Sequence, residues 1–187
     1  GPMWLGQRVL ILMTLVISAL KGRQLYWKSL TKDGILMIII GYPGIGKSSY
    51  VRRNVCAIDL ESSCFQKESN LAVSYCNVAI DLANQGFDVF VSSHDAVRKA
   101  LIASGYDELF AIYPSIDMEK QWVTRLYDRY WMTGLEKDRR AFERAKTRYS
   151  ADVAAIEKDV LRMRGWYEIK ELDYRLEDII EHFRYIC

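Results

Sequence analysis

The most informative residues in this chain are a run of eight that places glycine, lysine and serine at fixed spacing. Residues 41–48 read GYPGIGKS and fit the pattern G-x-x-x-x-G-K-[ST]. Glycines let a backbone curl round a phosphate with its N–H groups pointing inward, and a following helix adds a positive end. In such a loop Lys47 reaches the β and γ phosphates, and the Ser48 hydroxyl binds Mg²⁺. The pattern therefore predicts a site for ATP and Mg²⁺, with nine candidate residues: Gly41, Tyr42, Pro43, Gly44, Ile45, Gly46, Lys47, Ser48 and Ser49.

Two arginines further along the chain have the spacing of a phosphate-binding pair. Arg125 and Arg129 lie four residues apart in WVTRLYDRY, so they share one face of a helix. Two adjacent guanidinium groups repel each other unless an anion lies between them, and a transferred phosphoryl group is such an anion. We therefore predict that both are catalytic. The alternative is that both pair with nearby carboxylates on a solvated surface.

Carboxylates come at the end of the second apolar segment, in AIDLESS. The carboxyl ends of parallel strands line the ligand crevice of an open α/β sheet, so Asp59 and Glu61 would lie there. A carboxylate in that place accepts the proton of an attacking hydroxyl, or holds Mg²⁺ through water. Asp59 is the predicted catalytic base, and both residues are predicted to contact the acceptor. The alternative is that they belong to a loop or cap a helix.

The third apolar segment ends FVSSH, without the aspartate that many P-loop proteins carry at the end of this strand. Ser93 or His94 is therefore predicted to meet the acceptor, or water bound to Mg²⁺. Arg98 follows one turn into the next helix and is a candidate ligand for an acceptor phosphate. The alternative for Arg98 is an exposed helix arginine.

The segments GYPGIGKSS, IDLESS and FVSSH together resemble P-loop kinases of the nucleoside and nucleotide monophosphate type, with adenylate kinase as the broad relative. The same run is similar to small ATP-binding proteins of Gram-positive phages and prophages. The resemblance implies the strand order 2-3-1-4-5 and a mobile, arginine-bearing helical lid after the fourth strand. It also implies ATP- and Mg²⁺-dependent phosphoryl transfer to a small-molecule acceptor, best a nucleoside or nucleoside monophosphate. The alternatives are a polynucleotide-end kinase, and a nucleotide-dependent ATPase or partner-binding switch.

The elements that would position these residues alternate along the chain. Apolar segments between turn signals predict strands at 35–40, 55–59, 87–92, 109–113 and 167–172. Helical periodicity predicts helices at 48–53, 71–85, 95–104, 117–132, 135–164 and 176–183. Alternating strands and helices favour parallel pairing with right-handed crossovers. The expected fold class is therefore α/β, a three-layer α/β/α sandwich around a five-stranded parallel sheet.

Composition narrows the range of functions. The chain has 26 Lys and Arg against 24 Asp and Glu, a net charge of +2, which argues against a nucleic-acid-coating protein. The cysteines form no C-x-x-C pair, so a zinc site is not expected, and four cysteines in 187 residues are too few for a disulfide scaffold. Reduced thiols and a cytoplasmic location are the expectation. The four cysteines are Cys56, Cys64, Cys76 and Cys187.

The N-terminal segment differs from the rest of the chain. Residues 9–20 read VLILMTLVISAL, and Gly1-Pro2 has the form of a protease-cleavage scar. We divide the sequence into an extension with an apolar helix, residues 1–34, and a P-loop kinase domain, residues 35–187. Three interpretations of the extension stay open. In the first, Met37 is the natural start. In the second, residues 9–20 form a helix that packs on the domain, on a second copy as a homodimer, or on a membrane. In the third, these residues are a signal peptide.

Overall fold

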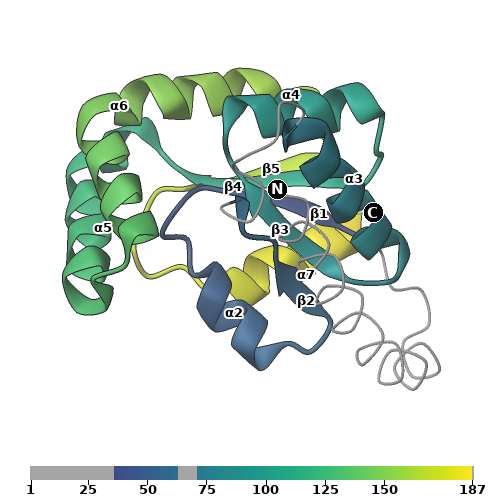
Figure 1. Ribbon diagram of the computed structural model, residues 1–187, viewed down its shortest axis with the longest axis horizontal. Helices are drawn as coiled ribbons and strands as arrows, with labels where there is room; N and C mark the ends of the chain where they lie inside the picture. The colour runs from purple at the N-terminus through teal and green to yellow at the C-terminus, as the bar shows by residue number, and fades with distance from the viewer. Residues whose placement is uncertain (1–35, 63–70, 187) are drawn as a thin grey trace, which may run out of the picture. The chain divides into compact units, whose positions relative to one another are not determined.

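Five parallel strands form the centre of the fold in the computed structural model, which describes residues 36–62 and 71–186 (Figure 1). Their order is β2-β3-β1-β4-β5, so the strand order implied by the sequence resemblance is confirmed. Ile38 is in register with Val89 on one side and with Leu109 on the other. The strand that carries the glycine-rich loop is therefore central. The strands are β1 (Ile38–Gly41), β2 (Ala57–Asp59), β3 (Asp88–Ser92), β4 (Leu109–Pro114) and β5 (Gly165–Ile169).

Helices cover both faces of this sheet, as an α/β fold requires. Figure 1 shows α3, α4 and α6 on one face and α2 and α7 on the other. A short 3₁₀ turn, η2 (Ile116–Met118), leads from β4 into α5, which packs against α6. The α-helices are α2 (Lys47–Arg53), α3 (Leu71–Asn84), α4 (Asp95–Ser104), α5 (Glu119–Thr133), α6 (Glu136–Val160) and α7 (Leu176–Ile186).

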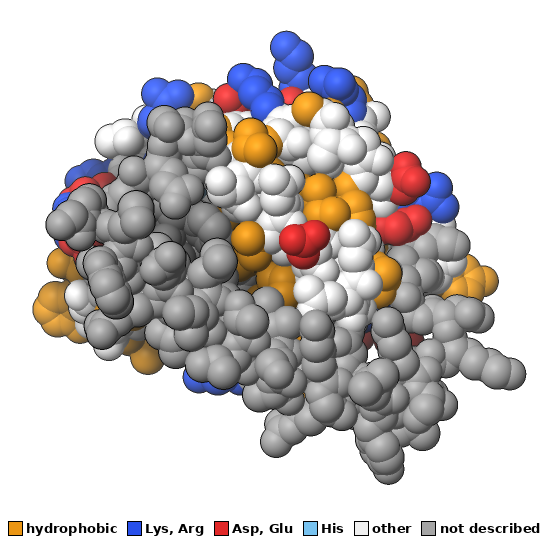
Figure 2. Space-filling view, turned by 45° about the vertical axis from the view of Figure 1, so that its right-hand side comes forward, with side chains coloured by type: hydrophobic (Ala, Val, Ile, Leu, Met, Phe, Trp, Pro, Cys, Tyr) orange, Lys and Arg blue, Asp and Glu red, His pale blue; other side chains and the backbone are white. Residues whose placement is uncertain are grey.

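Buried apolar side chains explain why β1 lies in the middle. All four residues of β1 are buried, and so are all six of β4. A continuous apolar strand is expected where helices cover both faces of a parallel sheet. On the surface, Figure 2 shows basic side chains beside acidic ones along the upper edge of the face drawn. Within residues 36–62 and 71–186, every helix is too short or too polar to cross a bilayer.

Several element boundaries differ by a few residues from those predicted, and two of these differences have a structural reason. The sequence predicted a fifth strand at 167–172, whereas β5 begins two residues earlier, at Gly165. A Cβ on Gly165 would lie 3.1 Å from the Phe110 ring, a tight contact, so glycine favours this close start against β4. Helix α6 ends at Val160 instead of 164, because the amide of Arg164 already bonds to the carbonyl of Leu109 at 2.9 Å. The predicted helix over residues 9–20 lies outside the described residues.

Candidate functional site

The glycine-rich loop joins the central strand to helix α2, and its glycines adopt conformations that other residues avoid. Gly44 and Gly46 have φ of +89° and +104°, in the left-handed half of backbone space. Gly41 meets a different constraint, because a Cβ there would lie 2.8 Å from Ile45 Cδ1 and 2.9 Å from Lys47 Cδ. The absence of a side chain at Gly41 thus lets Lys47 fold back over the loop.

Three successive carbonyl groups of the loop accept hydrogen bonds from side chains outside it. Trp122 Nε1 donates to the carbonyl of Pro43 at 2.8 Å. Arg125 Nε donates to the next carbonyl, that of Gly44, at 2.8 Å, and the Tyr174 hydroxyl donates to that of Ile45 at 2.7 Å.

These carbonyl bonds fix where the loop amides point. The described peptide bonds are all trans, and in a trans peptide the C=O and the N–H point in opposite directions. Carbonyls held outward therefore turn the amides of Gly44, Ile45 and Gly46 to the other side. A run of inward N–H groups is the usual form of an anion-binding concavity.

Lys47 is the cation of this concavity. Its side chain is 18% exposed, and its Nζ lies 3.3 Å from the carbonyl of Gly41 and 3.9 Å from Oδ1 of Asp59. Burial is the largest influence and lowers the pKa of Lys47, while Asp59 and Glu61 act in the opposite direction. A desolvated cation facing the loop gains most when an anion arrives.

Other loop residues serve packing. Tyr42 and Ile45 are buried, and the Tyr42 ring meets Tyr149 edge-on with centroids 5.8 Å apart. Burial raises the pKa of Tyr42. Ser48 and Ser49 are exposed at the start of α2, and the Oγ of Ser49 accepts a hydrogen bond from Arg52 at 3.2 Å. The Ser48 hydroxyl is thus accessible at the position that the motif gives to a Mg²⁺ ligand.

The two predicted carboxylates lie at the same edge of the sheet but have different partners. Asp59 ends β2 and faces Lys47. Glu61 accepts a hydrogen bond from the ammonium group of Lys137 on α6, at 2.5 Å. That bond raises the pKa of Lys137. The site therefore links β2 to the start of α6 through a pair that the sequence did not predict.

The structure separates the two predicted arginines by their contacts. Arg125 bonds to the loop carbonyl of Gly44. Arg129, one turn later on α5, has its Nε 2.9 Å from Oδ1 of Asp138. The charge of Arg129 also acts on the Lys47 ammonium and lowers its pKa. Of the two arginines, Arg129 is therefore the one whose charge is shown to act on the loop lysine.

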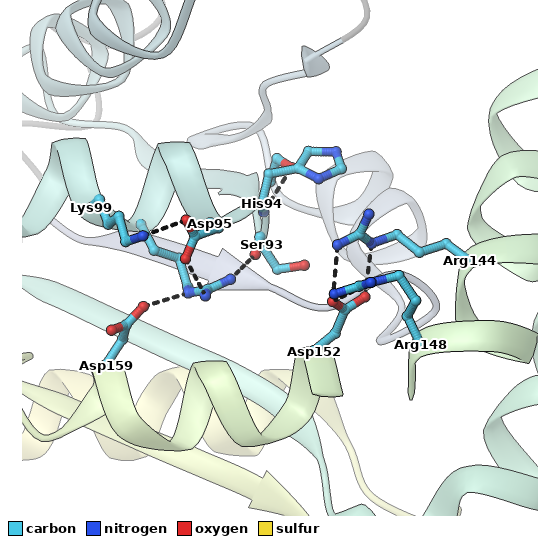
Figure 3. Close-up of polar contacts among 10 residues, drawn as sticks. Ser93, His94, Asp95, Lys99, Arg144, Arg148, Asp152 and Asp159 are labelled. Carbon is cyan, nitrogen blue, oxygen red and sulfur yellow. Dashed lines mark hydrogen bonds and ion pairs between the residues drawn. The ribbon is translucent and has the colours of Figure 1, made fainter. Parts of the chain in front are cut away.

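The residues after β3 form a second group, drawn in Figure 3. Arg98 is 3% exposed, and its guanidinium bonds to Asp159 Oδ2 at 2.8 Å, to Asp95 Oδ1 at 3.2 Å and to the carbonyl of Ser93. Arg98 thus has partners within the protein where the sequence predicted an acceptor phosphate. It ties the start of α4 to the end of α6.

His94 lies beside basic residues of α6. Figure 3 shows Arg144 and Arg148 both directed at Asp152, with His94 on the same side. Arg144 forms two bonds to that carboxylate, at 2.7 and 2.9 Å. Desolvation lowers the pKa of His94 first, and the charges of Arg144 and Lys47 lower it further. The imidazole is thus biased toward its neutral form near the loop lysine.

A bound Mg²⁺ fits the donors at this edge of the sheet. Mg²⁺ prefers oxygen ligands and usually keeps several waters, with one or two protein groups and the substrate phosphates. Ser48 and Asp59 supply a hydroxyl and a carboxylate from adjoining elements. In the described part of the chain, no three His, Cys, Asp or Glu residues come together as a metal cluster. Ser48 and Asp59 would be the protein groups that hold such an ion beside the substrate phosphates.

Sequence reasoning missed four residues that contact the loop or its neighbours. Lys137 and Asp138 were hidden in a run of charges, where nothing distinguishes a partner from a solvated residue. Trp122 fits a helical apolar stripe, which predicts burial but not the hydrogen bond of its indole. Tyr174 lies in a short polar stretch before α7, with no signal of its distant contact at Ile45.

Comparisons of this chain with protein-family models, with curated proteins and with solved structures find no match. The features of this chain that bear on its function are the motif, the contacts of its loop and the charges around Lys47.

Proposed function

We propose that this protein is an ATP- and Mg²⁺-dependent phosphotransferase that acts on a small-molecule acceptor, best a nucleoside or nucleoside monophosphate. The observation that carries the proposal is the loop at residues 41–48, whose three carbonyls bond to side chains outside the loop, so that the amides that follow them point the opposite way. Free amides of such a loop, together with the ammonium group of Lys47 at its end, suit the β and γ phosphates of a nucleoside triphosphate. The loop also follows the central strand of a parallel sheet, at the edge where such sheets bind ligands.

Three side chains have defined roles in this proposal. Lys47 holds the β and γ phosphates, and Arg129 stabilises the charge that develops on the transferring group. An oxygen of the acceptor, the hydroxyl of a nucleoside or a phosphate oxygen of a nucleoside monophosphate, attacks the γ phosphorus, so a new O–P bond forms. The bond from that phosphorus to the bridging oxygen breaks, and its electron pair stays on the ADP that leaves. Where the attacking group is a hydroxyl, Asp59, 3.9 Å from Lys47 in the free protein, takes its proton.

Mg²⁺, held by the Ser48 hydroxyl and through water by Asp59, would supply charge neutralisation between the β and γ phosphates. The acceptor would lie among Asp59, Glu61, Ser93 and His94. Glu61 is fixed by Lys137, and the carbonyl of Ser93 by Arg98. In this arrangement Arg98 does not bind the acceptor itself but holds the backbone of Ser93, which contacts the acceptor. The free thiols of Cys56 and Cys76 support a cytoplasmic location.

The polynucleotide-end kinase is the less favoured alternative. A strand-binding groove needs a continuous basic surface, whereas many exposed arginines here are neutralised by neighbours. Arg139 bonds to Glu136 and Glu143, and Arg140 bonds to Glu136. The side-by-side charges in Figure 2 follow the same pattern. These pairs favour a small acceptor.

The test is nucleotide binding followed by an acceptor screen. We expect the wild-type protein to bind ATP with Mg²⁺ in calorimetry, and Lys47→Ala to lose at least about 100-fold in affinity or turnover. Lys99→Ala is the matched control, because Lys99 is 69% exposed and pairs only with Asp95 among the contacts described. ATP consumption is then followed over nucleosides, mononucleotides, sugars and oligonucleotides. A wild-type protein that binds no nucleoside triphosphate, or a Lys47→Ala variant that behaves as wild type, would overturn the proposal.

A further inference from the structure

We propose that Trp122, Arg125 and Tyr174 act as positioning residues that hold the glycine-rich loop in its triphosphate-binding shape before any ligand arrives. We call these three residues the loop clamp. The inference rests on the proposed function, because it assigns to the clamp the affinity for the phosphate chain. It also gives Arg125 a different role from the one that its sequence spacing suggests.

The first argument is the match between donors and carbonyls. The clamp provides three donors, an indole N–H, a guanidinium N–H and a phenol O–H, and each meets a different one of three consecutive carbonyls. The donor–acceptor distances are 2.7 to 2.8 Å, within the normal range for such bonds. Each bond fixes one peptide plane, so the clamp sets the direction of three amides in a row.

The second argument is that the clamp residues support one another. The rings of Trp122 and Tyr174 are nearly parallel, with an interplanar angle of 21° and centroids 6.4 Å apart. The Arg125 Cζ lies 5.3 Å from the Trp122 centroid and 6.0 Å from that of Tyr174, at cation–π distance. Trp122 is fully buried. The donors are therefore held in place by packing before they bond to the loop.

The third argument concerns what the clamp prevents. A free glycine-rich loop samples many conformations, and in some of them a carbonyl oxygen replaces an amide in the concavity. A carbonyl oxygen there would repel a phosphate, and reordering the loop would reduce the affinity. Because α5 carries both Arg125 and Arg129, the bond of Arg125 to Gly44 also fixes the start of the turn that presents Arg129.

The experiment uses substitutions that remove one hydrogen-bond donor and leave an aromatic ring at the position. Tyr174→Phe removes the hydroxyl that reaches Ile45, and Trp122→Phe removes the indole N–H that reaches Pro43. The matched controls are Tyr185→Phe and Trp131→Phe, at residues that are 88% and 77% exposed. Dissociation constants are measured in the full chain for Mg·ATP and for inorganic tripolyphosphate, which has no base or sugar. The amide resonances of Gly44 and Gly46 report the loop directly.

We expect each clamp variant to lose about three- to ten-fold in affinity, the usual worth of one hydrogen bond. The loss should be equal for Mg·ATP and tripolyphosphate, with no change in the controls. The unfolding temperature should stay close to wild type for Tyr174→Phe and fall for Trp122→Phe, because the smaller ring leaves a cavity at a fully buried position. Trp122→Phe should shift the Gly44 amide and Tyr174→Phe the Gly46 amide. The double variant should lose less than the product of the single losses, because both residues hold one loop.

Each other outcome is decisive. If the wild-type protein binds neither probe, the proposed function itself fails. If the wild type binds both probes and the clamp variants match it, the inference is overturned and the proposed function stands. A loss confined to Mg·ATP would overturn it too, by showing that the rings contact the nucleoside. Arg125→Ala completes the test, since weaker tripolyphosphate binding supports the clamp, whereas unchanged binding with slower turnover places Arg125 on the transferring phosphoryl group.

Discussion

At the scale of single residues, the charge state of Lys47 controls the site. Burial lowers the pKa of this ammonium group below its ordinary value of 10.5. A bound phosphate chain would raise it again, because an anion favours the charged form. Binding therefore takes up a proton at any pH between the two values. Affinity is full below the pKa of the free protein and falls as the pH rises above it.

This linkage predicts that the affinity for Mg·ATP weakens in the alkaline range. Calorimetry between about pH 7 and about pH 10 should show the decrease, with proton uptake in buffers of different ionisation enthalpy. Lys47→Arg is the control, because a guanidinium keeps its charge over this range. An alkaline loss as steep in Lys47→Arg as in the wild type would assign the titration to another group.

Gly44 gives a second residue-scale prediction, because it combines a positive φ with a close neighbour. A Cβ there would lie 3.0 Å from Leu126 Cδ2 and 3.3 Å from Trp122 Nε1. Gly44→Ala should therefore cost about 1–3 kcal/mol more than a left-handed alanine alone. It should also weaken nucleotide binding.

The matched control for Gly44→Ala is Gly134→Ala. Gly134 has φ of +62° between α5 and α6, and a Cβ there would have no neighbour within 4 Å among the described residues. Urea unfolding of both variants separates backbone strain from steric contact. Equal losses of stability would show that the side chains of α5 move away from a Cβ at Gly44, and that this contact does not reduce the stability.

Some residue roles could be read from the sequence and others could not. The glycine-rich loop was predictable, because its constraints are local and each lies within eight residues. The partners of Arg98 and Arg125 are distant in sequence, at Asp159 and Gly44. The spacing of an arginine in the sequence does not show whether its partner is a phosphate or an oxygen atom of the protein. Only the tertiary contacts distinguish these cases.

At the scale of elements, the buried guanidinium of Arg98 joins α4 to α6. It contacts both Asp95 on its own helix and Asp159 near the end of α6. We expect Arg98→Ala to lower the free energy of unfolding by about 1–3 kcal/mol, because it removes a buried side chain and leaves the partly buried Asp159 carboxylate without its charged partner. Lys99→Ala is the control, since the exposed Lys99 shares only the Asp95 carboxylate, and should cost less than about 0.5 kcal/mol.

Denaturant melts of the two variants measure the difference directly. If Arg98→Ala is as stable as Lys99→Ala, water replaces the guanidinium, and α4 and α6 do not depend on this contact. If Arg98→Ala is less stable but binds nucleotide normally, the residue acts on the fold and not on the donor site. The second result is the one that we expect.

The element types were largely predictable, because strands and helices alternate and β1 and β4 are continuous apolar runs. The exception is β5, whose start was misplaced. It lies at the edge of the sheet, with Trp166 45% exposed, so its residues lack the apolar continuity of a central strand. Its position follows from the space beside Phe110, which no local pattern encodes.

At the scale of the whole described unit, the boundary predicted at residue 35 can be tested. The compact unit that holds the sheet begins at Leu36. The carbonyl of Leu36 accepts the Tyr106 hydroxyl at 2.7 Å, and that of Met37 accepts the amide of Val89 at 2.9 Å. A chain that starts at Leu36 keeps both carbonyls. We expect it to unfold cooperatively and to bind Mg·ATP like the full chain.

The comparison uses calorimetric unfolding and nucleotide titration of both chains. A second chain that starts at Ile38 is the informative partner, because it loses the carbonyls of Leu36 and Met37 and should be less stable. If the chain that starts at Leu36 is insoluble or does not bind nucleotide, residues 1–35 are required by the domain, and the predicted division is wrong.

The central place of β1 has a consequence for the order of events during protein synthesis. Ile38 pairs with Val89 and Leu109, which follow it by 51 and 71 residues. At a translation rate of about 5–20 residues per second, the second partner is made roughly 4–14 seconds after β1. Until then β1 lacks at least one of the two strands that flank it in the sheet. The segment that would hold the nucleotide is thus made before both of the strands that enclose it, and this part of the nascent chain needs protection from aggregation during that time.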